Sequence, residues 1–260
     1  MTTNDIDLDG HVVMVTGASK GIGLGIARHL ADLGARLVVT ARKPEALEAL
    51  SAELADRGTP HLARQLNTTD RDGAVALAAD VHAQFGRIDG LVANAQTFLS
   101  VTALEEITER NMDLLLDTGP KGTLWGMQSV LPYMRDQGRG RIVTMGSNAA
   151  INGAAGYGPY VASKEAIRGI TRVAAREWGP YGVTVNCVCP VSVAHRAPAS
   201  AEEDPVRAAV FAETFKNQPI ARDGDAALDI GPIVAFLLSD ASRYMTGQTL
   251  MADGGAIMRP

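Results

Sequence analysis

Residues 12–27 read VVMVTGASKGIGLGIA, and the fold expected for the chain follows first from this segment. It passes from an apolar run, typical of a buried strand, through a glycine-rich turn into a segment with helical spacing. Such a turn leaves backbone N–H groups and the positive end of the helix dipole free to hold a pyrophosphate. The stretch therefore predicts a dinucleotide-binding strand, turn and helix. A tight turn without a ligand is the alternative.

The same alternation of apolar runs and amphipathic segments continues along the chain. The runs predicted as strands are 11–16, 36–40, 61–66, 88–93, 141–145, 183–188 and 248–251. The segments predicted as helical are 21–33, 44–55, 71–85, the region 105–137, 157–178 and 225–239. Apolar strand interiors indicate burial on both faces. We therefore expect an α/β fold, a single doubly wound Rossmann-type domain over residues 1–260, in which helices cover both faces of a seven-stranded parallel sheet.

Composition narrows the classes of function. The 260 residues are 46% hydrophobic and carry a formal net charge of −5, without a basic run. This balance argues against a nucleic-acid or anionic-membrane partner. The first residues, MTTNDIDLDG, lack the apolar core of a signal peptide, and no stretch approaches the ~20 apolar residues of a membrane span. We expect a cytoplasmic protein that binds a small molecule.

The two cysteines, Cys187 and Cys189, share one face of a predicted strand. A disulfide between them is not expected, and a metal or redox site would need further ligands that no His or Cys cluster supplies. We predict small core side chains and no metal site.

One segment interrupts the alternation of predicted strands and helices. Residues 191–219 mix Ala, Pro and charged residues between the sixth predicted strand and the last predicted helix. This position corresponds to the end of the sheet where ligands bind, so we interpret the segment as a substrate-binding lid.

Several motifs occur in one order along the chain. They are T-G-x-x-x-G-I-G at 16–23, Asn94-Ala95, Ser147, Tyr160-x-x-x-Lys164, the Val-Asn-x-Val-x-Pro run at 185–190, Thr-Gly-Gln at 246–248 and Asp-Gly-Gly at 253–255. Together they resemble the short-chain dehydrogenase/reductase family, over nearly the whole chain. The resemblance implies a nicotinamide-dependent oxidoreductase and, commonly for this family, a homotetramer or homodimer.

Tyr160 and Lys164 are four residues apart in a predicted helix, so both side chains project from one face. A phenol has a pKa near ~10 in water, and a nearby ammonium lowers it by stabilising the phenolate. We therefore predict Tyr160 as the general acid/base. The resemblance implies that Lys164 also binds the nicotinamide ribose and that Ser147 orients the substrate oxygen. Tyr157 is a weaker candidate for the acid/base, because Val161 stands four residues after it.

The resemblance and the glycine loop also imply the residues that bind the cofactor. They are Gly17, Ser19, Lys20, Gly21, Ile22, Gly23, Arg42, Asn67, Thr68, Asn94, Ala95, Tyr160, Lys164, Pro190 and Val193. The family usually has Asp-Val at the end of the third strand, and here Asn67-Thr68 stands there. The carbonyl oxygen of Asn67 can still accept a hydrogen bond from adenine.

The end of the second predicted strand bears on the choice of nucleotide. NAD enzymes usually present an acidic residue there, whereas this chain has Thr40-Ala41-Arg42-Lys43. Arg42 could pair with a 2′-phosphate, and Lys20 could add a second charge. NADP(H) is therefore favoured, with NAD(H) possible, because Arg42 and Lys43 also fit a solvated helix start.

The sequence departs from the family at three positions. Gly119 stands where a fourth catalytic residue, an asparagine, is usual, and Gln96 and Val191 each replace a glycine. In the family the asparagine helps to hold water that links the lysine to solvent. The relay here must therefore use extra water in the vacated space or another side chain. Gly119-Pro120 also predicts a local kink or break in its helix.

The leading hypothesis is an oxidoreductase that transfers hydride between NADPH and a ketone or secondary alcohol. Two alternatives are an NAD-dependent alcohol dehydrogenase of a degradative pathway and a cofactor-binding protein with little catalysis. The side chains proposed for a hydrophobic substrate are Asn148, Ile151, Phe98, Tyr157 and His195. For His195 the favoured interpretation is a solvated loop histidine, and a contact with the cofactor or substrate near the nicotinamide is the alternative.

Overall fold

The computed structural model describes residues 6–99, 101–192 and 218–258. Seven strands form one parallel sheet in the order β3-β2-β1-β4-β5-β6-β7. They are β1 (Val12–Thr16), β2 (Arg36–Ala41), β3 (His61–Gln65), β4 (Gly90–Ala93), β5 (Gly140–Met145), β6 (Val183–Pro190) and β7 (Thr249–Ala252). β1 and β4 are neighbours although two strands separate them in sequence. Their carboxyl ends therefore mark the switch point where open α/β sheets bind ligands.

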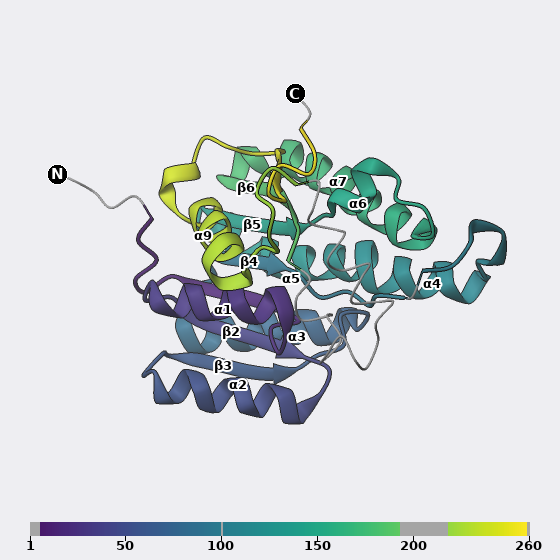
Figure 1. Cartoon of the computed structure of the whole chain (residues 1–260). Coiled ribbons are helices and arrows are strands. Elements are labelled where there is room, and N and C mark those ends of the chain that lie inside the picture. The colour runs from purple at the N-terminus through teal and green to yellow at the C-terminus, as the bar shows by residue number, and fades with distance from the viewer. Residues whose placement is uncertain (1–5, 100, 193–217, 259–260) are drawn as a thin grey trace.

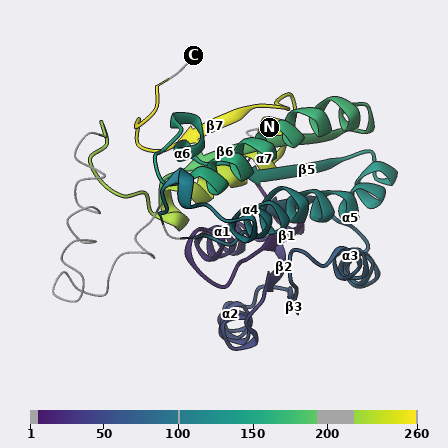
Figure 2. The same cartoon turned by 90° about the vertical axis from the view of Figure 1, so that its right-hand side faces the viewer.

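The helices lie on both faces of this sheet (Figure 1). They are α1 (Gly21–Asp32), α2 (Pro44–Asp56), α3 (Arg71–Phe85), α4 (Glu109–Leu116), α5 (Gly122–Asp136), α6 (Asn148–Asn152), α7 (Gly158–Trp178) and α9 (Gly231–Leu238). Figure 2 shows α1 on one side of the strands and α3 and α5 on the other. No helix in the described ranges is long and apolar enough to cross a membrane.

The alternation of side chains along each strand divides the core into two clusters. In β1, Val13 and Val15 pack with α1, α2 and α9, whereas Val12 and Met14 pack with α3, α5 and α7. All four side chains are buried. A strand that is apolar throughout therefore packs against a layer of helices on each face of the sheet, as the sequence predicts.

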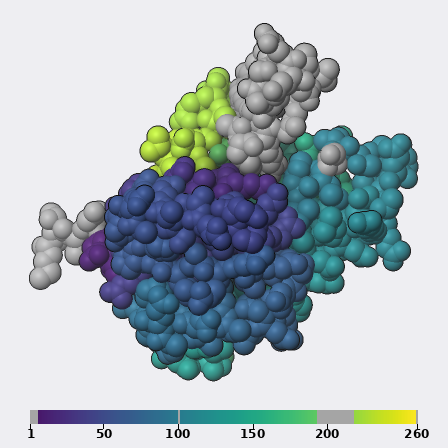
Figure 3. All heavy atoms as spheres, turned by 90° about the horizontal axis from the view of Figure 1, so that it is seen from below, coloured from purple at the N-terminus to yellow at the C-terminus, as the bar shows by residue number. Residues whose placement is uncertain are grey.

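The C-terminal elements return to the N-terminal helix. α1 packs against α9 and against the π turn η5 (Ala226–Ile230) that precedes it. Figure 3 shows the yellow-green C-terminal segment lying against the purple N-terminal helix. Because α1 begins at the glycine loop, this packing fixes the helix whose N-terminus faces the ligand site.

The seven predicted strands and most of the predicted helices are confirmed to within two residues at each end. Two regions differ. The short helix α6 follows β5, where no helix was predicted, and the predicted 105–137 region is divided. It contains a 3-10 turn at Leu104–Glu106, α4, a π turn at Asp117–Lys121 and α5. The break lies at Gly119-Pro120, as predicted, because Pro120 has no N–H for the carbonyls one turn back.

Candidate functional site

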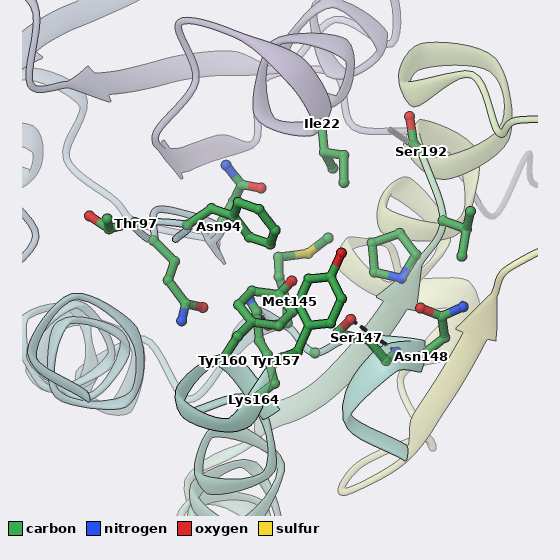
Figure 4. A pocket seen from close by; sticks show the side chains of 16 residues that line it. Ile22, Asn94, Thr97, Met145, Ser147, Asn148, Tyr157, Tyr160, Lys164 and Ser192 are labelled. Atoms are coloured by element: carbon green, nitrogen blue, oxygen red, sulfur yellow. Dashed lines mark hydrogen bonds between the residues drawn. The ribbon is translucent and has the colours of Figure 1, made fainter. Parts of the chain in front are cut away.

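A cavity of about 270 Å³ opens at the carboxyl ends of β4, β5 and β6. It is lined by Ile22, Asn94, Gln96, Thr97, Phe98, Met145, Gly146, Ser147, Asn148, Ala149, Tyr157, Tyr160, Lys164, Pro190, Val191 and Ser192. In Figure 4, Tyr160 and Lys164 project from α7, with Ser147 beside them and Asn94 and Ile22 across the cavity. Segments that are far apart in sequence thus meet at one site.

The three residues predicted to handle the proton lie in this cavity. Ser147 is the N-cap of α6, and its Oγ accepts a hydrogen bond from Ala149 N at 3.2 Å. This cap holds the hydroxyl at the cavity wall and leaves its O–H free to donate. Lys164 lies one helical turn from Tyr160, and its Nζ is 5.6 Å from the centre of the Tyr160 ring. The helical spacing therefore brings the phenol and the ammonium together, as predicted from the sequence.

Lys164 is an unusual side chain because it is only 5% exposed. Burial of an ammonium costs free energy unless hydrogen bonds satisfy it. Nζ donates to Met145 O, at the end of β5, at 2.7 Å. That bond uses one of the three N–H groups, so two are left to bind a ligand, water or the phenol oxygen.

The glycine loop after β1 is braced by Asn94. Its Nδ2 donates to Thr16 O at 2.9 Å and to Gly17 O at 3.2 Å. A Cβ on Gly23 would lie 2.5 Å from both Asn94 Nδ2 and Gly17 O, and Gly17 has a φ of 66°. Only glycine fits these two positions without strain. The loop, the start of α1 and Asn94 together form a cradle that fits a dinucleotide pyrophosphate.

Aromatic side chains form one wall of the cavity. The ring of Phe98 meets that of Tyr160 edge-on, with 5.3 Å between centroids, and lies 5.9 Å from that of Tyr157. Phe98 is 37% exposed, so part of its ring can contact a ligand. This wall offers an apolar surface beside the phenol of Tyr160.

The residues predicted for the adenosine end lie outside this cavity. Lys20 precedes α1 and Arg42 follows β2, and both are exposed. Within the described ranges, the Arg42 guanidinium makes no hydrogen bond or ion pair, although Gln65 Nε2 donates to its backbone oxygen. Asn67 is exposed after β3, and Thr68 lies against the start of α5. Two cations are thus available to an anionic ligand group on this side of the glycine loop.

The remaining predicted site residues are placed as follows. The cavity lining includes Ile22, Asn94, Phe98, Asn148, Tyr157 and Pro190 but does not include Ile151, which lies in α6. Gly17, Ser19, Gly21, Gly23 and Ala95 belong to the glycine loop, the start of α1 and the segment after β4. Val193, His195 and residues 193–217 of the predicted lid lie outside the described residues.

Several lining residues were not assigned to the site by sequence reasoning. They are Thr97, Met145, Gly146, Ala149 and Ser192, together with Gln96, which was noted only as a departure from the family. Each is within three residues of a predicted site residue and lies at or just after the end of a strand. That position was the available signal, since the carboxyl ends of neighbouring parallel strands converge.

The cysteines are buried and free, as predicted. Their sulfurs lie together under Gly146, where a Cβ would be 2.6 Å from Cys189 Sγ and 2.8 Å from Cys187 Sγ. The hydrogen bond with Cys187, reinforced by burial, raises the pKa of the Cys189 thiol. No group of His, Cys, Asp or Glu able to hold a metal ion occurs in the described part of the chain.

Comparisons with known proteins identify the family of the chain. A family model described as enoyl-(acyl carrier protein) reductase matches residues 17–256. The chain is 35% identical to 12alpha-hydroxysteroid dehydrogenase of a Clostridium species, over 97% of this chain and 98% of that protein. It is 36% identical to 3-oxoacyl-acyl-carrier-protein reductase of Staphylococcus aureus, over 94% of this chain and 97% of that protein.

Solved structures agree with these relatives. Levodione reductase superposes with a TM-score of 0.89 at 30% identity, covering 95% of this chain and 98% of that chain. NAD⁺-bound xylitol dehydrogenase superposes with a TM-score of 0.86 at 29% identity, covering 95% of this chain and 99% of that chain. The chain therefore belongs to the short-chain dehydrogenase/reductase family and is an NAD(P)-dependent oxidoreductase acting on CH–OH groups.

Proposed function

We propose that this enzyme transfers hydride between NADP(H) and an apolar ketone or secondary alcohol, with Tyr160 as the general acid/base. The observation that carries the proposal is the meeting of Ser147, Tyr160 and Lys164 in one cavity next to the glycine loop. The nicotinamide supplies or accepts the hydride when it is bound. The chain's own residues hold the substrate oxygen and move its proton.

The proton-handling steps follow from the side chains present. In the reductive direction, Ser147 Oγ donates a hydrogen bond to the carbonyl oxygen, because a carbonyl oxygen can only accept and the bond from Ala149 N leaves the serine O–H free. Tyr160 then gives its phenolic proton to that oxygen as carbon receives hydride. The ammonium of Lys164 stabilises the phenolate that remains. Oxidation of the alcohol uses the same groups in reverse.

Replacing Tyr160 by Phe tests the catalytic assignment. We expect the rate of ketone reduction to fall by at least 10²-fold, while the dissociation constant of the cofactor stays within about twofold of its original value. Activity is followed by NADPH absorbance over a panel of cyclic and linear ketones, and binding by fluorescence titration. Tyr157→Phe is the matched control, because Tyr157 lies on the same wall but has no lysine four residues later. Loss of activity in the control alone would contradict the assignment.

The preference for NADP(H) rests on the exposed cations Arg42 and Lys20 and on the lack of an acidic residue at 40–43. A guanidinium pairs well with a phosphate in bidentate geometry. Arg42→Ala should therefore raise the dissociation constant of NADPH about tenfold or more and leave that of NADH nearly unchanged. NAD(H) is the competing assignment, since the xylitol dehydrogenase relative is bound to NAD⁺. Tighter binding of NADH than NADPH by the unaltered enzyme would establish that alternative.

An apolar substrate is favoured by the wall formed by Phe98 and Tyr157. The relatives include a protein named for a hydroxysteroid, which is a large apolar alcohol. Phe98→Ala should raise the KM for cyclic apolar ketones more than that for short linear ones, because the ring offers contact area to a flat ligand. Equal effects on both substrate classes would argue against this wall as a specificity surface.

A further inference from the structure

A second cavity, of about 400 Å³, adjoins the cavity that contains Tyr160. It lies at the carboxyl ends of β6 and β7, which are neighbours at one edge of the sheet, and it reaches the first turn of α9 (Figure 1). We refer to the cavity around Tyr160 as the catalytic cavity and to the other as the second cavity. A space of this volume can hold a small ligand or one end of a larger ligand.

The lining of the second cavity is mainly apolar. Its hydrophobic side chains include Ile220, Ile230, Ile233, Met251 and Ile257. The charged side chains of the lining have partners within the protein. Arg222 bonds Asp229 through two N–H groups, and both carboxylate oxygens of Asp253 accept backbone N–H groups. The cavity therefore suits an uncharged, apolar group better than an ionic one.

Val191 is the one residue, among those that the structure describes, that lines both cavities. It directly follows β6 and is buried. The barrier between the two cavities is therefore a single residue. Its side chain is an isopropyl group at a position where the family usually has a glycine.

The backbone of Val191 is fixed on two sides. Val191 N donates to Ala252 O at 2.9 Å, which continues the pairing of β6 with β7. A Cβ on Gly224 would overlap Val191 O, so the two backbones are already in contact there. A main chain packed in this way moves little. The size of the side chain at position 191 then decides whether the cavities are joined.

We propose that Val191 is a specificity-determining residue, whose isopropyl group separates the two cavities and limits the length of the apolar substrate that reacts at Tyr160. This inference rests on the proposed function and deepens it. A ketone whose oxygen lies at Ser147 and Tyr160 must keep its tail within the catalytic cavity or extend it into solvent. With glycine at position 191, the tail can continue into the second cavity, where its burial is favourable.

A series of linear 2-alkanones of increasing length tests this role. For the unaltered enzyme we expect kcat/KM to rise with chain length and to level off once the catalytic cavity is full. Val191→Gly should move this limit to longer ketones, with a gain of up to about fourfold in kcat/KM for each methylene that the second cavity buries. Val191→Ala should move the limit by fewer carbons, and it keeps the test available if the glycine variant folds poorly. An unchanged limit in both variants would overturn the proposal.

Val188→Ala is the matched control. Val188 is buried in the core of the same strand and lines neither cavity. The control loses the same methyl groups as Val191→Ala, so its melting temperature should fall while the length limit stays in place. If Val188→Ala moves the limit as far as Val191→Ala does, loosening of β6 explains the effect and the proposal is wrong.

A larger side chain in the second cavity provides a test from the other side of the barrier. Ile233 belongs to α9 and lines the second cavity but not the catalytic cavity. Ile233→Phe should leave the length limit of the unaltered enzyme in place and should remove the gain of Val191→Gly when the two changes are combined. A shorter limit in Ile233→Phe alone would show that the cavities are already joined, which contradicts the proposed barrier.

Binding measured without turnover separates this inference from the proposed function. Linear 2-alkanols are titrated calorimetrically into enzyme saturated with NADPH, which cannot oxidise them because the cofactor is already reduced. Their dissociation constants should show the same length limit, and Val191→Gly should extend it. If no ketone is reduced, the proposed function fails and the titration still tests the barrier. Dissociation constants that show no extension in Val191→Gly would overturn the inference, whether or not the enzyme reduces ketones.

Discussion

At the scale of single residues, two polar side chains that line the cavity are held in place by hydrogen bonds to backbone carbonyl groups. Asn94 lines the cavity, yet both of its amide protons bond the backbone of the glycine loop. Lys164 is positioned by a carbonyl of β5, so a core strand fixes the place of the ammonium that we propose for catalysis. In both cases a polar side chain is placed by backbone groups, which move little when a ligand binds. These contacts pre-organise the site.

Asn94→Ala should loosen the glycine loop without removing a direct contact of the proton-handling group. Losing two hydrogen bonds to backbone carbonyls at Thr16 and Gly17 leaves those acceptors unpaired and should raise the cofactor dissociation constant roughly tenfold. Fluorescence titration with NADPH measures the change. Asn111→Ala serves as the control, because Asn111 belongs to the capping box of α4 and should affect stability alone. Unaltered cofactor binding in Asn94→Ala would show that the loop holds its shape without this brace.

At the scale of elements, close approach of backbones decides where the helices lie. α1 and η5 touch at Gly25, where a Cβ would overlap the Ala226 side chain and lie 2.6 Å from its carbonyl carbon. Residues 225–230 follow a long stretch of chain after β6, so no local pattern predicts their contact with α1. Glycine at position 25 permits this contact, which holds the helix that carries the glycine loop at its N-terminus.

Gly25→Ala should therefore destabilise the protein by about 1–3 kcal/mol, because the added methyl group forces α1 away from η5. Unfolding in urea measures the free energy. Gly169→Ala is a matched control in the interior of α7, where a Cβ would meet nothing within 4 Å. Alanine is the better helix former, so the control should be stabilised by about 0.5–1 kcal/mol. A loss of similar size in both variants would contradict the packing argument.

At the scale of the whole molecule, a charged cluster joins strands at the end of the sheet opposite the cavity. Arg139 Nη2 lies 3.1 Å from His11 Nε2 and 3.2 Å from Asp240 Oδ1, and Arg141 Nη2 also donates to Asp240 Oδ1. Arg87 pairs with the buried Asp89 nearby. Burial lowers the pKa of His11, and the positive charge of Arg139 adds to the effect against the opposing carboxylates Asp89 and Asp240.

The pKa of His11 predicts how stability depends on pH. The unfolded chain protonates His11 near its ordinary pKa of 6.5, whereas the folded protein does so only at lower pH. Between these values the unfolded state binds more protons, so the free energy of unfolding decreases as the pH falls. His11→Gln should make this decrease shallower in urea titrations below pH 6.5. Part of the slope should remain, since burial also lowers the pKa of His29. An unchanged slope in the variant would contradict this account.

Several features of this protein can be predicted from local sequence patterns alone. Strand and helix periods give the parallel sheet, the glycine spacing gives the loop after β1, and a spacing of four on one helix brings Tyr160 to Lys164. Only the tertiary structure decided how Gln96, Ser163 and Gly119 share one space, because they lie in three separate segments and no period along the chain relates them. The helix α6 could not be predicted from the sequence either, since it is one short turn, capped by Ser147, that is too short to show a helical period. Short-range patterns fix the elements, whereas long-range packing fixes which side chains meet at their ends.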